Sequence, residues 1–287
     1  MLFVATYKNC SFGSSFSRPA PALAPPLLVF RPLAQSLLYA LRQRNERLNR
    51  HRQLQMMHWH IVCDFDGTIT KTDVIDSILE RFADPSWEAI EEEWLSGQIG
   101  SRECLSRQLA LVKAYPAQLL EHFDSVKIDP AFPAFVDLVM GRGATLDIVS
   151  DGLEQGIARI LSRNDGPLLP IIANGLRQVD HDSWRIVFPY ASDACRAASG
   201  NCKCKSTPQG KRVLVIGDGK SDMCVASTAD FVFAKNSLAD HCERNGIPYA
   251  RFDSFAELPA LLALLPQSST PAVSRLPLEQ QELFHHV

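Results

Sequence analysis

The chain has 287 residues, of which 46% are hydrophobic, so it is long enough for a large core and is not compositionally disordered. Its net charge of -3 is unevenly divided, because residues 1–60 carry eight Lys and Arg against one acid and leave 21 basic and 31 acidic residues for the remainder. An acidic body argues against binding of nucleic acid, which requires a basic face to neutralise backbone phosphates.

The basic N-terminal segment differs in composition from the rest. Its first half is rich in Ser, Pro and Ala, and its second half, from Leu33 to Met56, is helix-prone. An Arg-rich, acid-poor start also resembles an organelle transit peptide, whereas a secretory signal fits poorly. We interpret residues 1–58 as a flexible extension, with Met57 as the natural beginning. No apolar run approaches the roughly 18 residues of a membrane span, so we expect a cytoplasmic protein with no membrane partner.

Eight cysteines are scattered along the chain without the dense spacing of a disulfide framework, so we expect reduced thiols. Cys195, Cys202 and Cys204 lie close together in the sequence. Zinc sites usually combine two pairs of ligands, and no second pair accompanies these three, so structural zinc is the less favoured interpretation.

The first strand is expected from His60 to Phe65, an apolar run that ends in acidic residues and glycine, as in a buried parallel strand. Amphipathic spacing then predicts four short helices, at residues 74–82, 85–95, 101–112 and 116–123. Asp73 or a neighbour is expected to cap the first helix and Ser101 the third. We expect residues 72–128 to form a small helical bundle inserted into the core.

After Asp129 the pattern alternates between helix and strand. Further strands are expected at residues 144–149, 171–179, 184–188, 212–216, 231–233 and 249–252. The helices between them are expected at residues 131–140 and 153–163, from 221 onward, and at 237–244 and 255–265. Parallel strands joined by helices predict a doubly wound, Rossmann-like α/β core made of residues 59–71 and 129–265. Residues 266–287 are expected to be a loose tail.

Polar clusters follow three of these strands: DFDGT begins at Asp64, SDG begins at Ser150, and GDGKSD runs from Gly217 to Asp222. Each cluster alone is compatible with an ordinary turn. In a parallel sheet, however, ligands bind beyond the carboxyl ends of the strands, where all three would meet. Four carboxylates in one crevice repel each other unless a cation lies among them, and an oxygen-only set of ligands indicates Mg²⁺.

Two nucleotide-binding motifs are excluded by single residues in the third cluster. A Walker A loop needs glycine where Leu214 stands, and a dinucleotide fingerprint needs its third glycine where Asp222 stands.

The ordered motifs resemble those of haloacid dehalogenase-type phosphatases: DFDGT, then Ser150, then a lysine ahead of a late strand, then Gly217-Asp218-x-x-x-Asp222. The resemblance covers about residues 59–265. The helical insertion resembles the cap of the phosphoserine phosphatase-like branch, and the segments CDFDGTIT, CKC and GDGKSD are most similar to the methionine-salvage phosphatases within it.

The resemblance implies a phosphomonoesterase that works through an aspartyl-phosphate. Asp64 would attack the phosphorus, and Asp66 would protonate the departing alcohol and later activate water. The phosphoryl oxygens would be held by Ser150 and the segment after it, together with a lysine; the implied phosphate-binding set is Ser150, Asp151, Gly152 and Lys203.

The same resemblance implies a Mg²⁺ site. Asp64, the main-chain carbonyl of Asp66 and Asp218 would bind the ion, and Asp222 would position these groups or a bound water. Lys203 and Lys205 both follow a cysteine and either is able to serve as the phosphate-binding lysine; we favour Lys203, because its surroundings match the family pattern better.

The chain departs from that pattern in the short segment 206–210, where relatives carry a full helix. A catalytically weakened binding or regulatory protein is therefore an alternative, as is phosphotransfer to an alcohol acceptor. The implied partner is a small phosphate ester. The candidates are 2-hydroxy-3-keto-5-methylthiopentenyl-1-phosphate, phosphoserine, phosphocholine and phosphoethanolamine, and the fold does not distinguish among them. Asp73 and Asp76 are candidates for recognition of a substrate amine. The residues indicate no oligomeric state.

Overall fold

The computed structural model describes residues 38, 39, 41–44 and 56–266 of the chain. Residues 56–266 belong to one compact unit, and the helical residues 38–44 that are described belong to a separate one. Most of the expected N-terminal extension and all but the first residue of the expected tail lie outside the described residues. Within the described part of the chain, no helix is long and apolar enough to cross a membrane.

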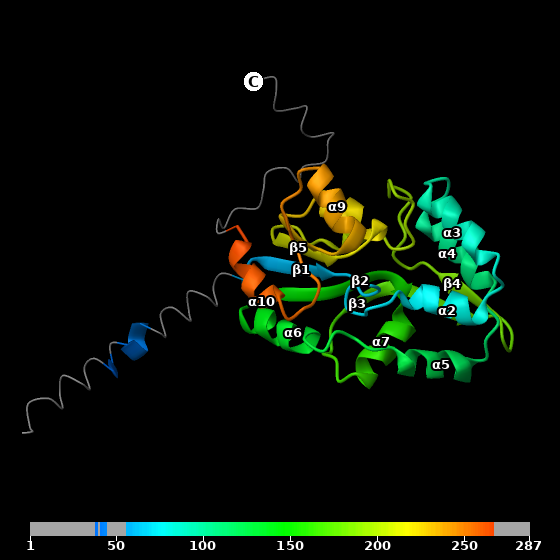
Figure 1. Ribbon diagram of the computed structural model, residues 1–287, viewed down its shortest axis with the longest axis horizontal. Helices are drawn as coiled ribbons and strands as arrows, with labels where there is room; N and C mark the ends of the chain where they lie inside the picture. The colour runs from blue at the N-terminus through cyan, green and yellow to red at the C-terminus, as the bar shows by residue number, and fades with distance from the viewer. Residues whose placement is uncertain (1–37, 40, 45–55, 267–287) are drawn as a thin grey trace, which may run out of the picture. The chain divides into compact units, whose positions relative to one another are not determined.

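A seven-stranded sheet forms the centre of the larger unit, in the order β4-β3-β2-β1-β5-β6-β7 (Figure 1). The strands are β1 (Trp59–Cys63), β2 (Thr145–Leu153), β3 (Ile171–Gln178), β4 (Trp184–Val187), β5 (Arg212–Gly217), β6 (Phe231–Ala234) and β7 (Tyr249–Arg251). All neighbours pair in parallel except β3 and β4, which form an antiparallel hairpin. The prediction of a doubly wound, mainly parallel α/β fold is confirmed.

Each face of the sheet has its own hydrophobic cluster. Every residue of β1 and β5 is buried, as expected for central parallel strands that are covered on both sides. Side chains alternate along a strand, so Ile61 and Leu214 lie in the larger cluster, whereas Val62 and Val213 lie in the smaller one. Because both faces are apolar, the polar groups of the site are confined to the ends of these strands.

The helices lie close to their expected positions. They are α2 (Val74–Phe82), α3 (Trp87–Leu95), α4 (Ser101–Ala110), α5 (Pro116–Ser125), α6 (Phe132–Gly141), α7 (Glu154–Arg163), α8 (Met223–Ala226), α9 (Asn236–Arg244) and α10 (Leu258–Leu261), with short 3₁₀ turns η1 (Lys203–Ser206), η2 (Lys220–Asp222) and η3 (Leu262–Leu264). The last predicted helix is shorter than expected, and the helix expected from residue 221 begins with the turn η2.

The four inserted helices form two pairs. In the first pair, Arg107 of α4 donates to Glu93 of α3 at 2.6 and 2.9 Å. In the second, Ser77 Oγ of α2 and His122 Nε2 of α5 lie 2.9 Å apart. Helix α4 packs on β4 and helix α5 on α7, so the two pairs rest on different parts of the core (Figure 1).

The two expected helix caps have different outcomes. Asp73 caps α2, because its Oδ1 accepts a hydrogen bond from the Asp76 N–H at 3.1 Å. The expectation that Ser101 caps α4 is wrong. Gly100 is the N-cap, and the Ser101 hydroxyl instead donates to Asp151 Oδ2 at 2.7 Å. The end of α4 does not need this hydroxyl, because Ser101 is buried and the Arg102 N–H donates to the Ala198 carbonyl at 3.2 Å instead.

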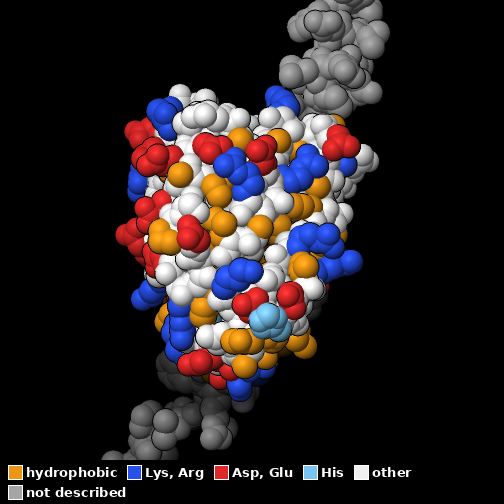
Figure 2. Space-filling model, turned by 90° about the vertical axis from the view of Figure 1, so that its right-hand side faces the viewer, with side chains coloured by type: hydrophobic (Ala, Val, Ile, Leu, Met, Phe, Trp, Pro, Cys, Tyr) orange, Lys and Arg blue, Asp and Glu red, His pale blue; other side chains and the backbone are white. Residues whose placement is uncertain are grey.

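Acidic and basic side chains are interspersed on the face of the molecule shown in Figure 2, with no continuous basic area on that face.

Candidate active site

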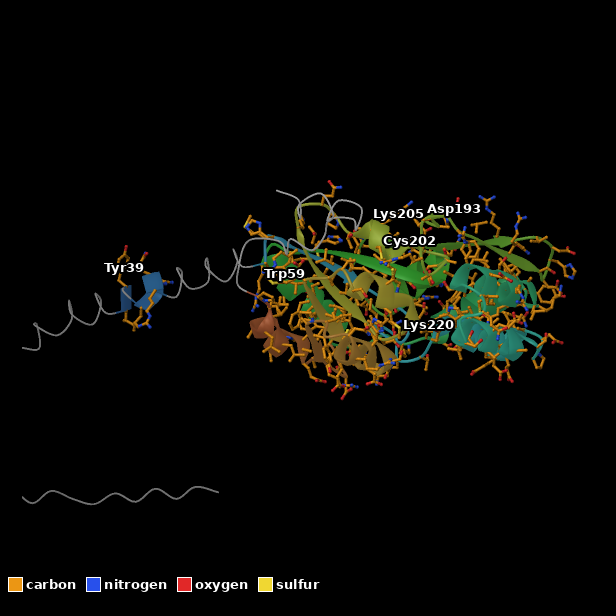
Figure 3. All side chains as sticks on the ribbon, turned by 90° about the horizontal axis from the view of Figure 1, so that it is seen from above. Tyr39, Trp59, Asp193, Cys202, Lys205 and Lys220 are labelled. Atoms are coloured by element: carbon orange, nitrogen blue, oxygen red, sulfur yellow. The ribbon has the colours of Figure 1, made fainter. Side chains whose placement is uncertain are left out.

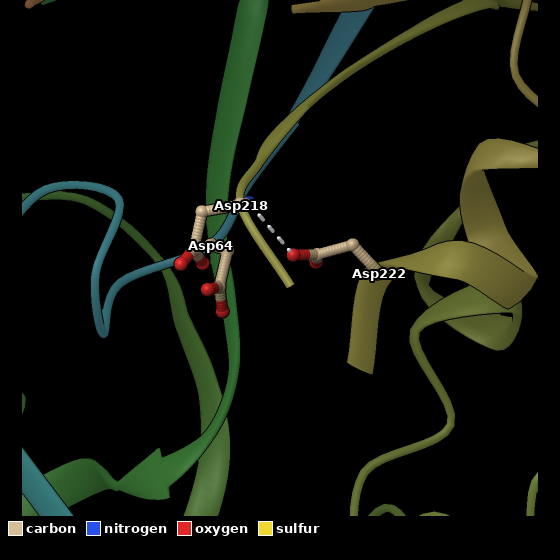
Figure 4. A group of neighbouring side chains, drawn as sticks. All are labelled: Asp64, Asp218 and Asp222. Atoms are coloured by element: carbon tan, nitrogen blue, oxygen red, sulfur yellow. Dashed lines mark hydrogen bonds between the residues drawn. The ribbon is translucent and has the colours of Figure 1, made fainter. Parts of the chain in front are cut away.

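The three polar clusters converge at the carboxyl end of the sheet. Cys63 of β1 pairs with Ile216 of β5 and with Ile148 of β2, so the residues that follow these strands emerge side by side. One carboxylate oxygen from each of Asp64, Asp218 and Asp222 lies within 4.8 Å of the others (Figure 4). Among the residues that the structure describes, this is the one group with the convergence that a metal ion requires.

Lys203 lies between two of these carboxylates. Its Nζ donates to Asp64 Oδ1 at 2.6 Å and to Asp222 Oδ1 at 2.7 Å, and the residue is 3% exposed. Burial by itself lowers the pKa of Lys203, but the attraction of Asp222, Asp64 and Asp151 outweighs burial and raises the pKa, so the ammonium stays charged. Lys205 is exposed (Figure 3). The short segment 206–210 therefore does not keep Lys203 away from Asp64.

Two main-chain N–H groups of the loop after β5 hold Asp222. The N–H groups of Asp218 and Gly219 donate to Asp222 Oδ2 at 3.2 and 3.3 Å. A Cβ on Gly217 would lie 2.4 Å from the same oxygen, so glycine is required for this approach. Burial raises the pKa of Asp64 against the opposing effect of Lys203, and burial followed by repulsion from Asp222 raises the pKa of Asp218 to about 6.

Asp66 faces Ser150 across the site. Ser150 Oγ donates to Asp66 Oδ2 at 3.1 Å, and the Gly152 N–H donates to Ser150 Oγ at 2.8 Å. Burial and then the charge of Asp73 raise the pKa of Asp66 to about 8. Asp66 is therefore largely protonated at neutral pH and is able to donate a proton, unlike an ordinary exposed carboxylate.

Asp151 lies beside Ser150 but its side chain is occupied. Its carboxylate accepts from Ser101 Oγ at 2.7 Å and from the Asn201 N–H at 2.6 Å. It thus ties helix α4 and the segment leading to Lys203 to strand β2. This strand continues to Leu153, so the expectation that it ends before Ser150 is wrong; the pairing with β3 shifts register here, which frees the strand to bend around the site.

Sequence reasoning missed the groups that hold the loop before Lys203. Asn201 Nδ2 donates to the carbonyls of Ser150 and Ile172 at 3.1 and 2.7 Å, and Asn174 Nδ2 donates to the Asp151 carbonyl at 2.6 Å. The available signal was the position of Asn201, two residues before Lys203; nothing local marked Asn174.

A cavity of about 330 Å³ lies between the sheet edge and the inserted helices. Its core side includes Asp64, Asp66, Ser150 and Asp218, and its other side is lined by residues of α2, α3 and α4 and the segment before α2, namely Lys71, Asp73, Ile75, Asp76, Glu91, Trp94, Ser101, Cys104, Leu105 and Gln108. Burial, followed by repulsion from Asp73 and Glu91, raises the pKa of Asp76 to about 7. The acidic groups of the insertion thus face the acidic groups of the core across the cavity.

Lys220 of the core reaches helix α3 of the insertion. Lys220 Nζ donates to the carbonyl of Trp94 and, at 3.2 Å, to that of Leu95, and lies 4.9 Å from the centre of the Trp94 ring (Figure 3). These carbonyls belong to the last turn of α3, where a helix lacks its own donors and its dipole favours a cation. Lys220 therefore joins the loop after β5 to the insertion.

The motifs and their convergence can be compared with known proteins. The model of the haloacid dehalogenase-like hydrolase family matches residues 61–227, which is more than half of the chain. The chain belongs to this family. The expectation of a haloacid dehalogenase-type phosphatase is confirmed with it.

Relatives within the family cover most of the described unit. The chain is 32% identical to the 2-hydroxy-3-keto-5-methylthiopentenyl-1-phosphate phosphatase of Geobacillus kaustophilus (strain HTA426), over 69% of this chain and 92% of that protein. It is 33% identical to the protein of the same name from Brevibacillus brevis (strain 47), over 72% and 96%.

Solved structures show the same haloacid dehalogenase-like fold. A phospho-aspartyl intermediate analogue of phosphoserine phosphatase superposes with a TM-score of 0.54 at 17% identity, over 72% of this chain and 98% of that one. Phosphoserine phosphatase from T. onnurineus in complex with NDSB-201 gives a TM-score of 0.56 at 18% identity, over 74% and 98%.

Proposed function

We propose that the protein is a Mg²⁺-dependent phosphomonoesterase that hydrolyses a small phosphorylated metabolite through an aspartyl-phosphate on Asp64. The observation that carries this proposal is the meeting of Asp64, Asp218 and Asp222 within 4.8 Å, with Lys203 bonded to two of them. A nucleophile beside a fixed cation and a potential metal site matches what phosphoryl transfer requires.

The residues at the sheet edge fit Mg²⁺. Their donors are carboxylate oxygens, which this ion prefers, and their mutual repulsion raises the pKa of Asp64 and Asp218 in addition to the larger effect of burial. Asp64, the main-chain carbonyl of Asp66 and Asp218 would hold the ion, and Asp222 would orient them. When bound, Mg²⁺ supplies positive charge to the phosphoryl oxygens.

The side chains then have distinct tasks. Asp64 attacks the phosphorus, while Lys203 neutralises the charge that builds on the phosphoryl group. Asp66 transfers its proton to the oxygen of the departing alcohol, and afterwards takes a proton from the water that hydrolyses the aspartyl-phosphate. Ser150 Oγ and the Asp151 N–H bind the phosphoryl oxygens, while the Gly152 N–H orients the Ser150 hydroxyl through its bond of 2.8 Å.

The inserted helices, residues 72–128, act as a cap over the core formed by residues 59–71 and 129–265. Support comes from the cavity that the insertion lines opposite Asp64, and from the Lys220 contact to α3. A cap of this kind encloses a small substrate and excludes bulk water from the reacting phosphate.

We infer 2-hydroxy-3-keto-5-methylthiopentenyl-1-phosphate as the first substrate to test, since relatives at 32% and 33% identity carry that name. Phosphoserine is the second, on the likeness of fold alone. We also infer a cytoplasmic location, which agrees with the free state of the seven cysteines in the described residues.

The test is hydrolysis by the purified chain of p-nitrophenyl phosphate and of a panel of phosphorylated metabolites, with Mg²⁺ or with EDTA. We expect Mg²⁺-dependent release of phosphate that Asp64→Asn abolishes, and retention of phosphate on the protein after rapid acid quench of the wild type. Turnover in EDTA equal to that in Mg²⁺, or unchanged turnover of Asp64→Asn, would refute the proposal.

A further inference from the structure

The cysteine cluster near Lys203 has no part in the proposed chemistry. In the structure, Cys204 Sγ lies 3.3 Å from Cys224 Sγ and donates a hydrogen bond to it. Both residues are half-buried, so small reagents are able to reach them. Among the described residues, the one converging group of three or more side chains able to hold a metal ion is Asp64, Asp218 and Asp222, which contains no cysteine, so we consider this pair as thiols.

The two sulfurs lie close in sequence to the buried ion pair of the site, which joins Lys203 of η1 to Asp222 of η2. Cys204 follows Lys203 in η1, and Cys224 lies in α8, two residues after Asp222. Lys203 Nζ and Asp222 Oδ1 are 2.7 Å apart. Thr207 also bonds to the 3₁₀ turn η1, because its Oγ1 donates to the Cys204 carbonyl at 2.8 Å. A change in the distance between the sulfurs therefore acts on the backbone that positions the Lys203 ammonium.

We propose that Cys204 and Cys224 form an oxidation site, at which a peroxide or a small-molecule disulfide converts the two thiols into a disulfide that displaces Lys203 and lowers phosphatase activity. The chemical part stands on the geometry of the sulfurs. The effect on activity rests on the proposed function, in which Lys203 contacts the nucleophile Asp64.

With a peroxide, one sulfur attacks an oxygen, the O–O bond breaks, and a sulfenic acid and one water form after proton transfer. The second sulfur then attacks the first, the S–OH bond breaks, and the thiol proton leaves with hydroxide as a second water. Two electrons pass from the two thiols to hydrogen peroxide, which becomes two waters. With a small-molecule disulfide, one sulfur attacks it, breaks its S–S bond and releases one small thiol, and the second sulfur then attacks the mixed disulfide and releases the other, so the same two electrons reduce the reagent.

The bond shortens the distance between the sulfurs from 3.3 Å to about 2.05 Å, so the two sulfurs must approach by about 1.2 Å, through rotation of the side chains together with movement of η1 against α8. Displacement by about 1 Å in an active site reduces turnover by up to about 100-fold. We expect a loss of tenfold or more on oxidation, because Lys203 follows the movement of its neighbour Cys204.

The experiment uses the full chain, reduced and then treated with hydrogen peroxide or oxidised glutathione. We expect the loss of two titratable thiols, a mass lower by two hydrogen atoms, a peptide cross-link between Cys204 and Cys224, and a tenfold or greater fall in turnover that dithiothreitol reverses. Cys204→Ser and Cys224→Ser should keep their activity after treatment. Cys195→Ser is the matched control and should remain sensitive, because Cys195 Sγ contacts Ser199 Oγ, at 3.6 Å, instead of either member of the pair.

Three results would overturn the inference: a cross-link that involves other cysteines, thiols that stay unreactive because they retain zinc, or a Cys204–Cys224 disulfide with unchanged turnover. If the reduced wild type hydrolyses no phosphate ester, the proposed function fails, while the thiol count and the peptide map still decide whether the pair is oxidised.

Discussion

Replacement of Lys203 by Met tests whether the ammonium holds the carboxylates of the site together. The substitution keeps the length and apolar stem of the side chain but removes bonds of 2.6 and 2.7 Å to Asp64 and Asp222, both buried. Removal of one partner from a buried ion pair costs about 3 to 5 kcal/mol, because the remaining charge is left uncompensated. We therefore expect Lys203→Met to lose about 3 to 5 kcal/mol of unfolding free energy in EDTA at pH 7.

The measurement is urea unfolding of the wild type, Lys203→Met and Lys205→Met. Lys205 is exposed, so its variant should stay within about 0.5 kcal/mol of the wild type. At pH 5 the loss in Lys203→Met should shrink. Lys203 lowers the pKa of Asp64 against the larger effect of burial, so without Lys203 the folded-state pKa of Asp64 lies higher than in the wild type, and a group with a raised folded-state pKa adds stability as the pH falls.

Mg²⁺ should also narrow the gap between Lys203→Met and the wild type, because it provides another cation to the same carboxylates. At a concentration of about 100 times its dissociation constant, Mg²⁺ adds about 2.7 kcal/mol to the unfolding free energy of a protein that binds it only when folded. Lys203→Met has one positive charge fewer at the site and should bind Mg²⁺ more tightly than the wild type does. Equal stability of Lys203→Met and the wild type in EDTA would refute the reasoning.

Three further predictions concern other parts of the site. Because the pKa of Asp66 is raised to about 8, kcat/KM for an alkyl phosphate should fall as the pH rises through this value, or through a lower one with Mg²⁺ bound. The value of kcat/KM for p-nitrophenyl phosphate, whose leaving group needs no proton, should fall less. Identical pH profiles for the two substrates would contradict the role of Asp66 as the acid. Gly217→Ala places a Cβ 2.4 Å from Asp222 Oδ2 and should weaken Mg²⁺ binding, measured by calorimetry, about 10 to 100-fold. Gly219→Ala is the control, because the space around Gly219 is open and Mg²⁺ binding should not change. Equal Mg²⁺ affinities of the two variants would argue against Asp222 as an orienting group. Lys220→Met removes the contact to α3 and should lower kcat/KM about fivefold, which corresponds to the loss of about 1 kcal/mol for partly exposed hydrogen bonds. Steady-state kinetics of the variant test this, and an unchanged kcat/KM would show that the contact does not support closure of the insertion over the core.

Local patterns in the sequence were enough to predict the sheet and most of the site. The buried run of β1 and the polar residues after β1 and β5 predicted where Asp64 and Asp218 would lie, because parallel strands necessarily end at a common edge. Asp73 was predicted as a cap from local sequence as well, because a capping side chain bonds to an N–H only three residues away.

The choice between Lys203 and Lys205 was of a different kind. The two residues lie two positions apart in the sequence, in similar chemical surroundings, and only the path of η1 turns the first toward Asp64 and leaves the second exposed. The favoured interpretation agrees with this geometry, but it came from resemblance to a family and not from a physical signal in the segment.

Tertiary structure alone decided the groups that tie distant segments together. Ser101 bonds to Asp151, 50 residues away, and Cys204 meets Cys224 across two separate elements. Hydropathy and capping patterns describe how a residue relates to neighbours within a few positions, so they determine which segments become strands and helices. Contacts between segments depend on how those elements pack, and a burial-driven choice of partner, such as that of Ser101, overrides the local preference.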